Sequence, residues 1–185
     1  MAKLTPTFGW LELTEYRGWV PGDPPYGPRT SLLEPGIEGE RLLLTGRVLT
    51  KSGTPLADVR LDFWQADAAG KYALEKRRLR GVQHSTSDGT FTLETIMPGY
   101  AGYIRHINFM AAAPLPNRKQ PLLLRAAIYL ATEEELDRPI AAADRAYVRP
   151  GAHIYRDDPA FLQLRAIPLE NGLRHVSYDI VFDVE

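Results

Sequence analysis

The sequence predicts an all-β protein, an antiparallel β-sandwich. Short runs of residues alternate between apolar and polar side chains, which is typical of half-buried strands. Gly, Pro, Asp and Ser residues between these runs supply turns. Helical patterns do not alternate with the runs, so the arrangement typical of a parallel α/β sheet is missing. A chain of 185 residues can bury one core, and we expect one domain.

The expected strands begin after residue 40. Over residues 42–49, Leu42, Leu44, Gly46 and Val48 alternate with Leu43, Thr45, Arg47 and Leu49, and a turn at 51–55 follows them. The other candidate strands are alternating or apolar and lie at 59–64, 90–93, 104–110, 122–130 and 176–182. One short helix is expected at 132–138, where Thr132 would cap its start and the acidic residues that follow would suit its positive end.

Residues 1–39 differ in composition from the rest of the chain. They are rich in Pro, Gly and aromatic residues, including Trp10, Tyr16 and Trp19. The prolines exclude a long helix, and the aromatic content argues against disorder. We therefore expect an arm over 1–39 that wraps the sandwich domain, 40–185, or a partner subunit. The expected assembly is a homo-oligomer, such as a dimer, or a hetero-oligomer in which this chain is one subunit.

Composition and charge exclude several kinds of site and partner. The chain has no cysteine, so any metal ligands must be oxygen atoms or imidazoles. Its net charge of -1 provides no basic field for nucleic acid or for an anionic membrane, and we expect neither as a partner. No signal-peptide pattern or apolar run of about 20 residues is present, so the expected location is cytoplasmic.

The segment 99–109 carries the densest group of candidate site residues. Tyr100, Tyr103 and His106 follow a Pro-Gly turn at the point where a strand pattern begins. Tyr72 follows another Gly turn upstream. Phenolate and imidazole groups suit a hard, oxidised metal such as ferric iron, Fe(III). These residues therefore indicate a candidate metal site at the ends of strands.

The run from Leu61 to Tyr72 reads Leu-Asp-Phe-Trp-Gln-Ala-Asp-Ala-Ala-Gly-Lys-Tyr. This run closely resembles a signature of the intradiol ring-cleavage dioxygenases, which include the catechol and protocatechuate 3,4-dioxygenases. The resemblance continues through short segments at 45–48, 53–55, 79–83, 88–91, 95–100 and 106–109. The resemblance extends to about residue 130, and the rest matches only in its strand pattern. It implies a β-sandwich of the intradiol dioxygenase type that holds non-haem ferric iron.

The resemblance also implies roles for individual residues. The family binds iron through two tyrosinates and two histidines, and a catechol-type substrate chelates the metal. One tyrosine is then displaced and acts as a base, and the ring opens between its two hydroxylated carbons. The metal ligands would be Tyr72, Tyr100, His106 and Asn108, and the catalytic groups Tyr72, Tyr100, Tyr103 and His106. The expected substrate contacts are Tyr16, Gln83 and Arg105.

Three positions depart from the family pattern. Asn108 replaces the second histidine ligand, and a neutral amide oxygen is a poorer donor for iron than imidazole. Tyr103 occupies the position of the family's catalytic arginine. Ala127 falls where the family has a glutamine on the next strand. Loss of groups that support metal ligands commonly costs about 10–100-fold in affinity or activity.

Three hypotheses follow for the activity. In the first, iron still binds and an aromatic diol is cleaved oxidatively, with Asn108, water, or a displaced residue (Tyr103, His84 or His153) completing the shell. In the second, a metal-free or metal-altered pocket performs acid–base chemistry, such as cyclisation or isomerisation, on a phenolic substrate. In the third, the chain is a non-catalytic subunit similar to the α subunit of protocatechuate 3,4-dioxygenase, although the presence of both Tyr72 and Tyr100 argues against this.

Overall fold

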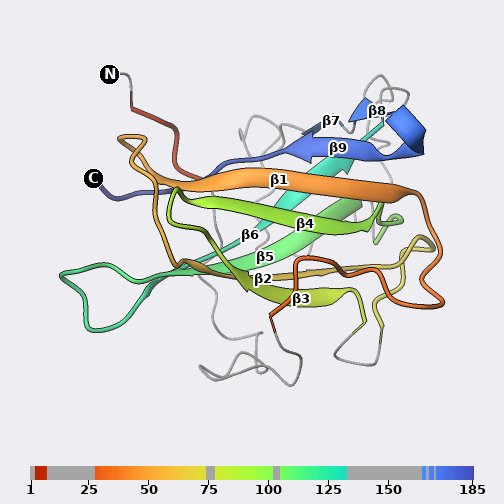
Figure 1. Cartoon of the computed structure of the whole chain (residues 1–185), viewed down its shortest axis with the longest axis horizontal. Helices are drawn as coiled ribbons and strands as arrows, with labels where there is room; N and C mark the ends of the chain where they lie inside the picture. The colour runs from red at the N-terminus through yellow and green to blue at the C-terminus, as the bar shows by residue number, and fades with distance from the viewer. Residues whose placement is uncertain are drawn as a thin grey trace, which may run out of the picture.

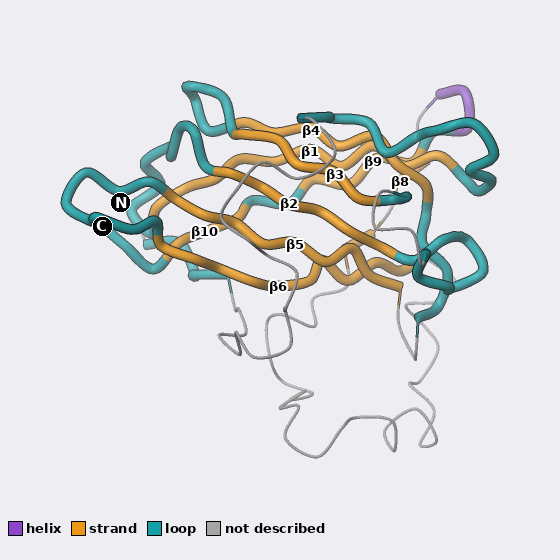
Figure 2. Tube along the Cα trace, turned by 90° about the horizontal axis from the view of Figure 1, so that it is seen from below, coloured by secondary structure: helices purple, strands orange, loops and turns teal. Residues whose placement is uncertain are grey.

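The computed structural model shows two β-sheets stacked face to face (Figures 1 and 2). It describes residues 3–7, 28–73, 78–101, 105–132, 164–165, 167–168 and 170–185. The expected β-sandwich is confirmed. None of the helical turns in these ranges is long and apolar enough to span a membrane.

The first sheet is built around β1 (Arg41–Thr50). On one side β1 pairs antiparallel with β4 (Thr90–Ile96), in a register that sets Leu44 opposite Leu93. On the other side it pairs in parallel with β9 (Arg174–Ser177) and β10 (Ile180–Phe182). The short β8 (Ile167–Pro168) pairs with β9, which the 3₁₀ turn η3 (Glu170–Gly172) precedes. This sheet is therefore mixed, although the sequence suggested antiparallel pairing.

The second sheet has the strand order β3-β2-β5-β6-β7. Its strands are β3 (Arg80–His84), β2 (Arg60–Gln65), β5 (Arg105–Ala113), β6 (Leu122–Ala131) and β7 (Leu164–Arg165). Adjacent strands in the set β3, β2, β5 and β6 are antiparallel to one another, and β7 runs parallel to β6. This sheet carries the residues of the candidate site.

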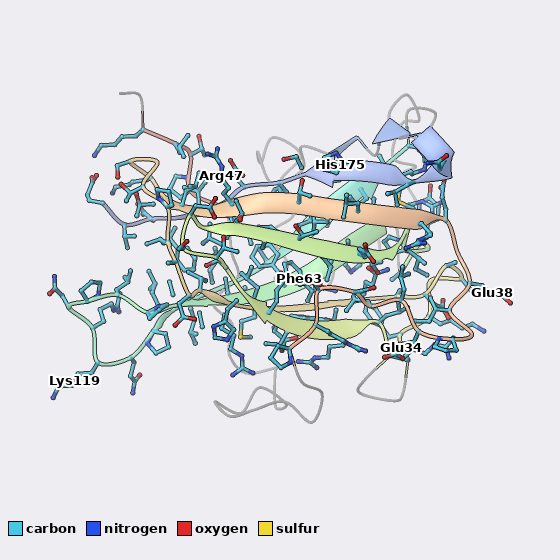
Figure 3. All side chains as sticks on the ribbon, viewed as in Figure 1. Glu34, Glu38, Arg47, Phe63, Lys119 and His175 are labelled. Carbon is cyan, nitrogen blue, oxygen red and sulfur yellow. The ribbon has the colours of Figure 1, made fainter. Side chains whose placement is uncertain are left out.

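The core lies between the two sheets and follows the alternation of each strand. Leu61 and Phe63 on β2 face inward, where Phe63 lies 5.6 Å from Phe91 of the opposite sheet, measured between ring centroids (Figure 3). Ile107 and Phe109 on β5 face the same way and are fully buried. Burial of each of these large side chains contributes about 1.5–3 kcal/mol to stability. The intervening residues of β2 and β5 therefore point to the outer face of the second sheet.

Two buried glutamines link the sheets. The Gln65 amide nitrogen donates to the Ile96 carbonyl at 2.9 Å, and its amide oxygen accepts a hydrogen bond from the Thr95 hydroxyl at 2.9 Å. Gln83 donates to the Thr92 carbonyl at 2.8 Å. These bonds hold β4 against the edge formed by β2 and β3, and Gln65 does so at the end of β2 from which the loop to Tyr72 begins.

The segment 28–32 closes the edge of the sandwich between β3 and β4. Arg29 N–H donates to the Val82 carbonyl of β3, and Leu32 N–H donates to the Glu94 carbonyl of β4. Leu32 is fully buried. Gly81 makes this possible, because a Cβ there would lie 2.6 Å from Leu32 Cδ2. This part of the predicted arm packs on the domain, while Tyr16 lies outside the described residues.

The predicted strands agree with the structure except near the C-terminus. The single strand expected over 176–182 is two strands, β9 and β10. They are separated because Tyr178 N–H donates to the Thr45 carbonyl and the Asp179 carboxylate accepts from Arg47 N–H at 2.9 Å. The strand β3 and the two-residue strands β7 and β8 were not expected. Of the helix expected over 132–138, only Thr132 is among the described residues.

Candidate active site

The candidate site lies on the outer face of the second sheet. His106 and Asn108 alternate on β5 with the buried residues Ile107 and Phe109, so both point outward. His106 is the register partner of Tyr129 on β6. Asn108 lies between its partners on β2 and β6, Trp64 and Ala127. The sheet thereby places imidazole and amide side chains two residues apart on one surface.

Tyr72 reaches this surface from the loop that follows β2. Asp67 fixes the loop, because its carboxylate accepts hydrogen bonds from the backbone N–H groups of Ala69 and Lys71, both at 2.9 Å. The Gly70 N–H also donates to the Asp67 carbonyl at 3.0 Å. Asp67 therefore organises the turn that leads to Tyr72.

The loop that carries Tyr72 is pressed against the loop that carries Tyr100. The Gly99 N–H donates to the Asp67 carbonyl at 2.8 Å. Gly70 has a φ of 80°, and a Cβ there would collide with the Tyr100 carbonyl. A Cβ at Gly99 would collide with Gly70 N and the Ala68 carbonyl. Two facing glycines thus allow the two tyrosine-bearing loops to touch.

The Tyr72 phenol oxygen joins His106 and Asn108. The Asn108 amide Nδ2 donates to it at 2.9 Å, and the oxygen lies 2.8 Å from His106 Nε2. The phenol oxygen accepts from Asn108, and it donates its own proton to His106 Nε2 when that nitrogen is unprotonated. The pKa of Tyr72 is raised because burial disfavours the phenolate, while the bond from Asn108 acts in the opposite direction.

Tyr100 is held by Arg105. The Arg105 Cζ lies 4.4 Å from the centroid of the Tyr100 ring, within cation–π range, and its Nη1 donates to the Pro98 carbonyl at 2.8 Å. The Arg105 side chain therefore joins the start of β5 to the loop before it. Tyr72 and Tyr100 are 45% and 46% exposed, so both phenols are accessible to a small molecule.

Sequence reasoning missed Tyr129, which lies beside His106. It is 7% exposed, and its ring centroid lies 6.2 Å from that of His106. Packing of this ring limits the orientations open to the imidazole. The apolar run 122–130 predicted the strand but gave no reason to single out one tyrosine, and only its register against β5 does so.

Sequence reasoning also missed an ion pair on the same face. Arg80 on β3 contacts the Asp62 carboxylate through Nε at 3.2 Å and Nη2 at 2.7 Å. Burial raises the pKa of Asp62 to about 7, and the nearby charge of Arg60 acts in the opposite direction. Both Asp62 and Trp64 belong to the signature run, whose strand alternation predicts that they share a face.

The remaining expected site residues lie elsewhere or outside the described residues. Gln83 is 5% exposed and hydrogen-bonds within the sandwich, so the structure does not bring it to Tyr72 as a substrate contact. His84 lies at the far end of β3 with its Nδ1 2.6 Å from the Asp58 carboxylate. Tyr16, Tyr103 and His153 lie outside the described residues.

The donor set at Tyr72 is consistent in chemistry with ferric iron. In the part of the chain that the structure describes, no group of three or more His, Asp or Glu side chains is placed to hold a metal ion. Tyr72 offers a phenol oxygen, His106 an imidazole nitrogen and Asn108 an amide oxygen, and hard oxygen donors with imidazole suit this metal. Tyr100, on the contacting loop, offers a second phenol oxygen.

Similarity to known proteins agrees with this arrangement. A family model described as dioxygenase matches residues 30–183. A hydroxyquinol 1,2-dioxygenase of Rhizobium sp. strain MTP-10005 is 36% identical over 69 residues, which are 34% of this chain and 23% of that protein. A protocatechuate 3,4-dioxygenase beta chain of Burkholderia cepacia is 34% identical over 80 residues, 38% of this chain and 34% of that protein. The matches thus span only about a quarter to a third of those relatives.

Solved structures resemble the whole chain. The dioxygenase domain of a carbohydrate-binding fusion protein from Streptomyces sp. SirexAA-E is 34% identical with a TM-score of 0.68, over 98% of this chain and 100% of that domain. An intradiol ring-cleavage dioxygenase from Tetranychus urticae is 21% identical with a TM-score of 0.64, over 98% of this chain and 95% of the other, and shares the fold. The chain belongs to the intradiol dioxygenase family.

Proposed function

We propose that this enzyme cleaves the ring of an aromatic diol at ferric iron held by Tyr72, Tyr100 and His106, with the Asn108 amide oxygen as a weaker fourth donor. The observation that carries the proposal is the convergence of Tyr72, His106 and Asn108. Their polar atoms meet within 2.9 Å at one phenol oxygen on an accessible face of the sheet. Ring cleavage is the chemistry of the family to which the chain belongs.

Iron, when bound, would act as a Lewis acid that accepts the diol oxygens as ligands and makes the ring more reactive toward oxygen. The chain itself supplies groups that bind and orient the substrate and move its protons. The Tyr72 phenol oxygen would take a proton from a substrate hydroxyl when that oxygen is ionised, whereas His106 Nε2, 2.8 Å away, would be engaged as a metal ligand. Arg105 holds the Tyr100 ring in place through its guanidinium group.

Asn108 sets the expected strength of metal binding. An amide oxygen carries no formal charge and is a weaker donor than imidazole, so iron would be held less tightly than by two histidines. Its Nδ2 also donates to the Tyr72 oxygen. That hydrogen bond favours the charged phenolate, which is the form that binds metal.

The experiment combines metal analysis with oxygen uptake. We expect protein loaded anaerobically with iron, then oxidised, to hold up to one iron per chain and to show a visible band from phenolate-to-iron charge transfer. Addition of a catechol should consume one molecule of oxygen for each ring opened. Tyr72→Phe should abolish both the band and the uptake. A colourless, iron-free protein after loading would overturn the proposal.

A second candidate function is metal-free acid–base catalysis on a phenolic substrate. The direct bond between the Tyr72 phenol and His106 Nε2 supports it, because a tyrosine and a neutral histidine in contact can relay a proton. Such an enzyme would turn over its substrate without oxygen and in the presence of a chelator. Anaerobic turnover by iron-free protein that is lost in His106→Gln would favour this candidate.

A further inference from the structure

Trp64 on the outer face of the second sheet contacts two guanidinium groups. The Cζ of Arg80 lies 5.6 Å from the indole ring centroid, and that of Arg125 lies 5.8 Å from it. Both distances fall within the roughly 6 Å range of cation–π attraction. Arg80 belongs to β3 and Arg125 to β6, which lie on opposite sides of β2. Two cationic partners therefore restrain the indole ring.

The Arg80 side chain is itself fixed by a buried carboxylate. Asp62, which is 2% exposed, accepts hydrogen bonds from Arg80 Nε at 3.2 Å and from Nη2 at 2.7 Å. Two bonds from one guanidinium to one carboxylate set the plane of the guanidinium. Asp62 and Trp64 alternate with the inward-facing Phe63, so the carboxylate and the indole share the outer face. The indole thus packs on a support that is held in place.

Trp64 is also a direct neighbour of Asn108 in the candidate site. The register of β2 and β5 pairs these two residues, and paired residues share a face with Cβ atoms about 4.5–5.5 Å apart. Trp64 and Arg125 lie on either side of β5, so their side chains meet above the strand that carries Asn108. On its β6 side Asn108 is paired with Ala127, which has only a methyl group. The indole is therefore the larger of the two cross-strand neighbours of Asn108.

The orientation of the Asn108 amide matters because its two ends differ. The nitrogen Nδ2 donates hydrogen bonds, whereas the oxygen Oδ1 accepts them. In the structure Nδ2 donates to the Tyr72 phenol oxygen at 2.9 Å. Rotation of the amide about its last torsion angle would bring Oδ1 to the phenol oxygen instead and would remove this bond. Packing against a fixed indole restricts that rotation on the β2 side.

We propose that Trp64 is a positioning residue of the candidate site, which holds the Asn108 amide in the orientation that donates to Tyr72. The indole acts only through Asn108 and takes no part in binding metal or moving protons. An amide that is already held in this orientation loses less entropy when its hydrogen bond forms. The inference goes beyond the proposed function, and rests on it only for its relevance to ring cleavage.

The test follows the side-chain amide of Asn108 by NMR in protein prepared without iron, and Asn108→Ala identifies its resonances. In the unmodified protein we expect one of the two amide protons to show the shift of a hydrogen-bonded group. Trp64→Leu removes the flat ring and should move both resonances toward those of a solvent-exposed asparagine. Trp64→Phe keeps an aromatic face for the two guanidinium groups, so it should restore most of the difference.

Arg125→Met tests the same link with the indole still present, because it removes one of the two cations that restrain the ring. It should move the Asn108 resonances in the same direction as Trp64→Leu, but by less. The matched control is Arg47→Met on β1 of the first sheet, where Arg47 pairs with Asp179 at 3.2 Å (Figure 3). This variant should leave the Asn108 resonances unchanged, and circular dichroism should show that all variants are folded. Unchanged Asn108 resonances in Trp64→Leu and Arg125→Met, or an equal shift in Arg47→Met, would overturn the proposal.

Iron affinity shows whether Trp64 acts through Asn108. Loss of a group that orients a metal ligand commonly costs about 10–100-fold, and we expect Trp64→Leu to lower iron affinity by about tenfold. When Trp64→Leu is added to Asn108→Ala, no further loss should occur, and a further tenfold loss would contradict action through Asn108.

The same samples separate the positioning role from the proposed function, because the NMR comparison needs no iron. Asn108 resonances that respond to Trp64, in a protein that never consumes oxygen with catechol, would support the positioning role and contradict ring cleavage. Oxygen uptake with catechol, in a protein whose Asn108 resonances do not respond to Trp64, would support ring cleavage and contradict the positioning role.

Discussion

Asn108 on β5 and Ala127 on β6 are register partners, so their side chains lie next to one another on the outer face of the second sheet. Both positions depart from the pattern of the intradiol dioxygenases that the sequence resembles, in which they carry a histidine and a glutamine. Because the two positions are adjacent, both departures alter the same part of the site. The Tyr72 phenol oxygen contacts this part directly, because it accepts a hydrogen bond from Asn108 Nδ2.

We predict that Asn108→His increases the iron content of the purified protein. Imidazole is a stronger donor to the metal than an amide oxygen, and position 108 already points toward the Tyr72 phenol. We expect iron affinity to rise by about tenfold or more, at the scale by which supporting groups affect metal sites. Elemental analysis and the charge-transfer band measure the change.

The double variant Asn108→His, Ala127→Gln is the companion experiment. A glutamine at 127 can hydrogen-bond the group at 108 or the substrate, so the double variant should gain more ring-cleaving activity than Asn108→His alone. Asn108→Ala provides the reference without a donor at this position. Equal iron content in Asn108→His and Asn108→Ala would contradict the assignment of position 108 as a ligand.

We predict that Gly70→Ala separates the two tyrosine-bearing loops. Gly70 has a φ of 80°, and its missing side chain leaves room for the Tyr100 carbonyl. Alanine would therefore introduce both backbone strain and a steric collision, at a cost of about 2–4 kcal/mol. We expect a lower Tm and loss of the iron band, because Tyr72 and Tyr100 would no longer be held together.

Gly53→Ala is the matched control. Gly53 has a φ of 87°, so alanine there meets similar backbone strain, but nothing lies within 4 Å of its added Cβ. We expect a cost of only about 1 kcal/mol, or about 2–4 °C in Tm, with an unchanged iron band. If both variants behaved alike, close packing of the loops would not be what positions the tyrosines.

Much of the site could be predicted from local sequence. Strand alternation is enough to place His106 and Asn108 on one face, and the Gly-rich turns mark the loops of Tyr72 and Tyr100. Tyr129 could not be found this way, because nothing within its own apolar strand distinguishes it. Its role depends on the register between β5 and β6, which is a long-range property.

Gln83 shows the limit of inference from a resemblance. It stands in a segment that matches the family, and its polar side chain suggested a substrate contact. The structure instead turns it inward, because it occupies the same face of the sheet as its register partner Leu61. The division of 176–182 into β9 and β10 likewise could not be predicted from local sequence. It depends on hydrogen bonds to Thr45 and Arg47 of β1, which lies far away in the sequence.

We predict that Arg80→Gln makes stability strongly dependent on pH. Asp62 has a folded pKa of about 7, against 3.8 for the free side chain, so between these values the folded state binds more protons than the unfolded state. The contribution of this group is therefore present at low pH and is lost as pH rises toward 7. Without Arg80 the pKa of Asp62 should rise further, so the destabilisation should be small where the carboxyl is protonated and should grow by up to about 1.4 kcal/mol per pH unit above pH 7, where the carboxyl ionises without its partner.

Denaturant unfolding between about pH 5 and pH 8 measures this effect. We expect Arg80→Gln to be much less stable than the unmodified protein at the upper end and closer to it at the lower end. Asp62→Asn in the same background removes the titrating group and should flatten the difference. A deficit in Arg80→Gln that is constant with pH would show that the arginine acts through packing on Trp64 instead.

We predict that Gln65→Met disrupts the site from inside the core. Gln65 is 2% exposed, and it joins the end of β2 to Thr95 and Ile96 on β4. Methionine has a similar volume but leaves the Thr95 hydroxyl and the Ile96 carbonyl without this partner, at a cost of about 2–4 kcal/mol. Because the loop to Tyr72 starts at this point, iron content should fall together with Tm.

The control variant Gln83→Met removes a single hydrogen bond between the same two sheets, farther from that loop. It should lower Tm by less and leave iron content unchanged, and a loss of iron in Gln83→Met as large as that in Gln65→Met would contradict the link between the end of β2 and the site.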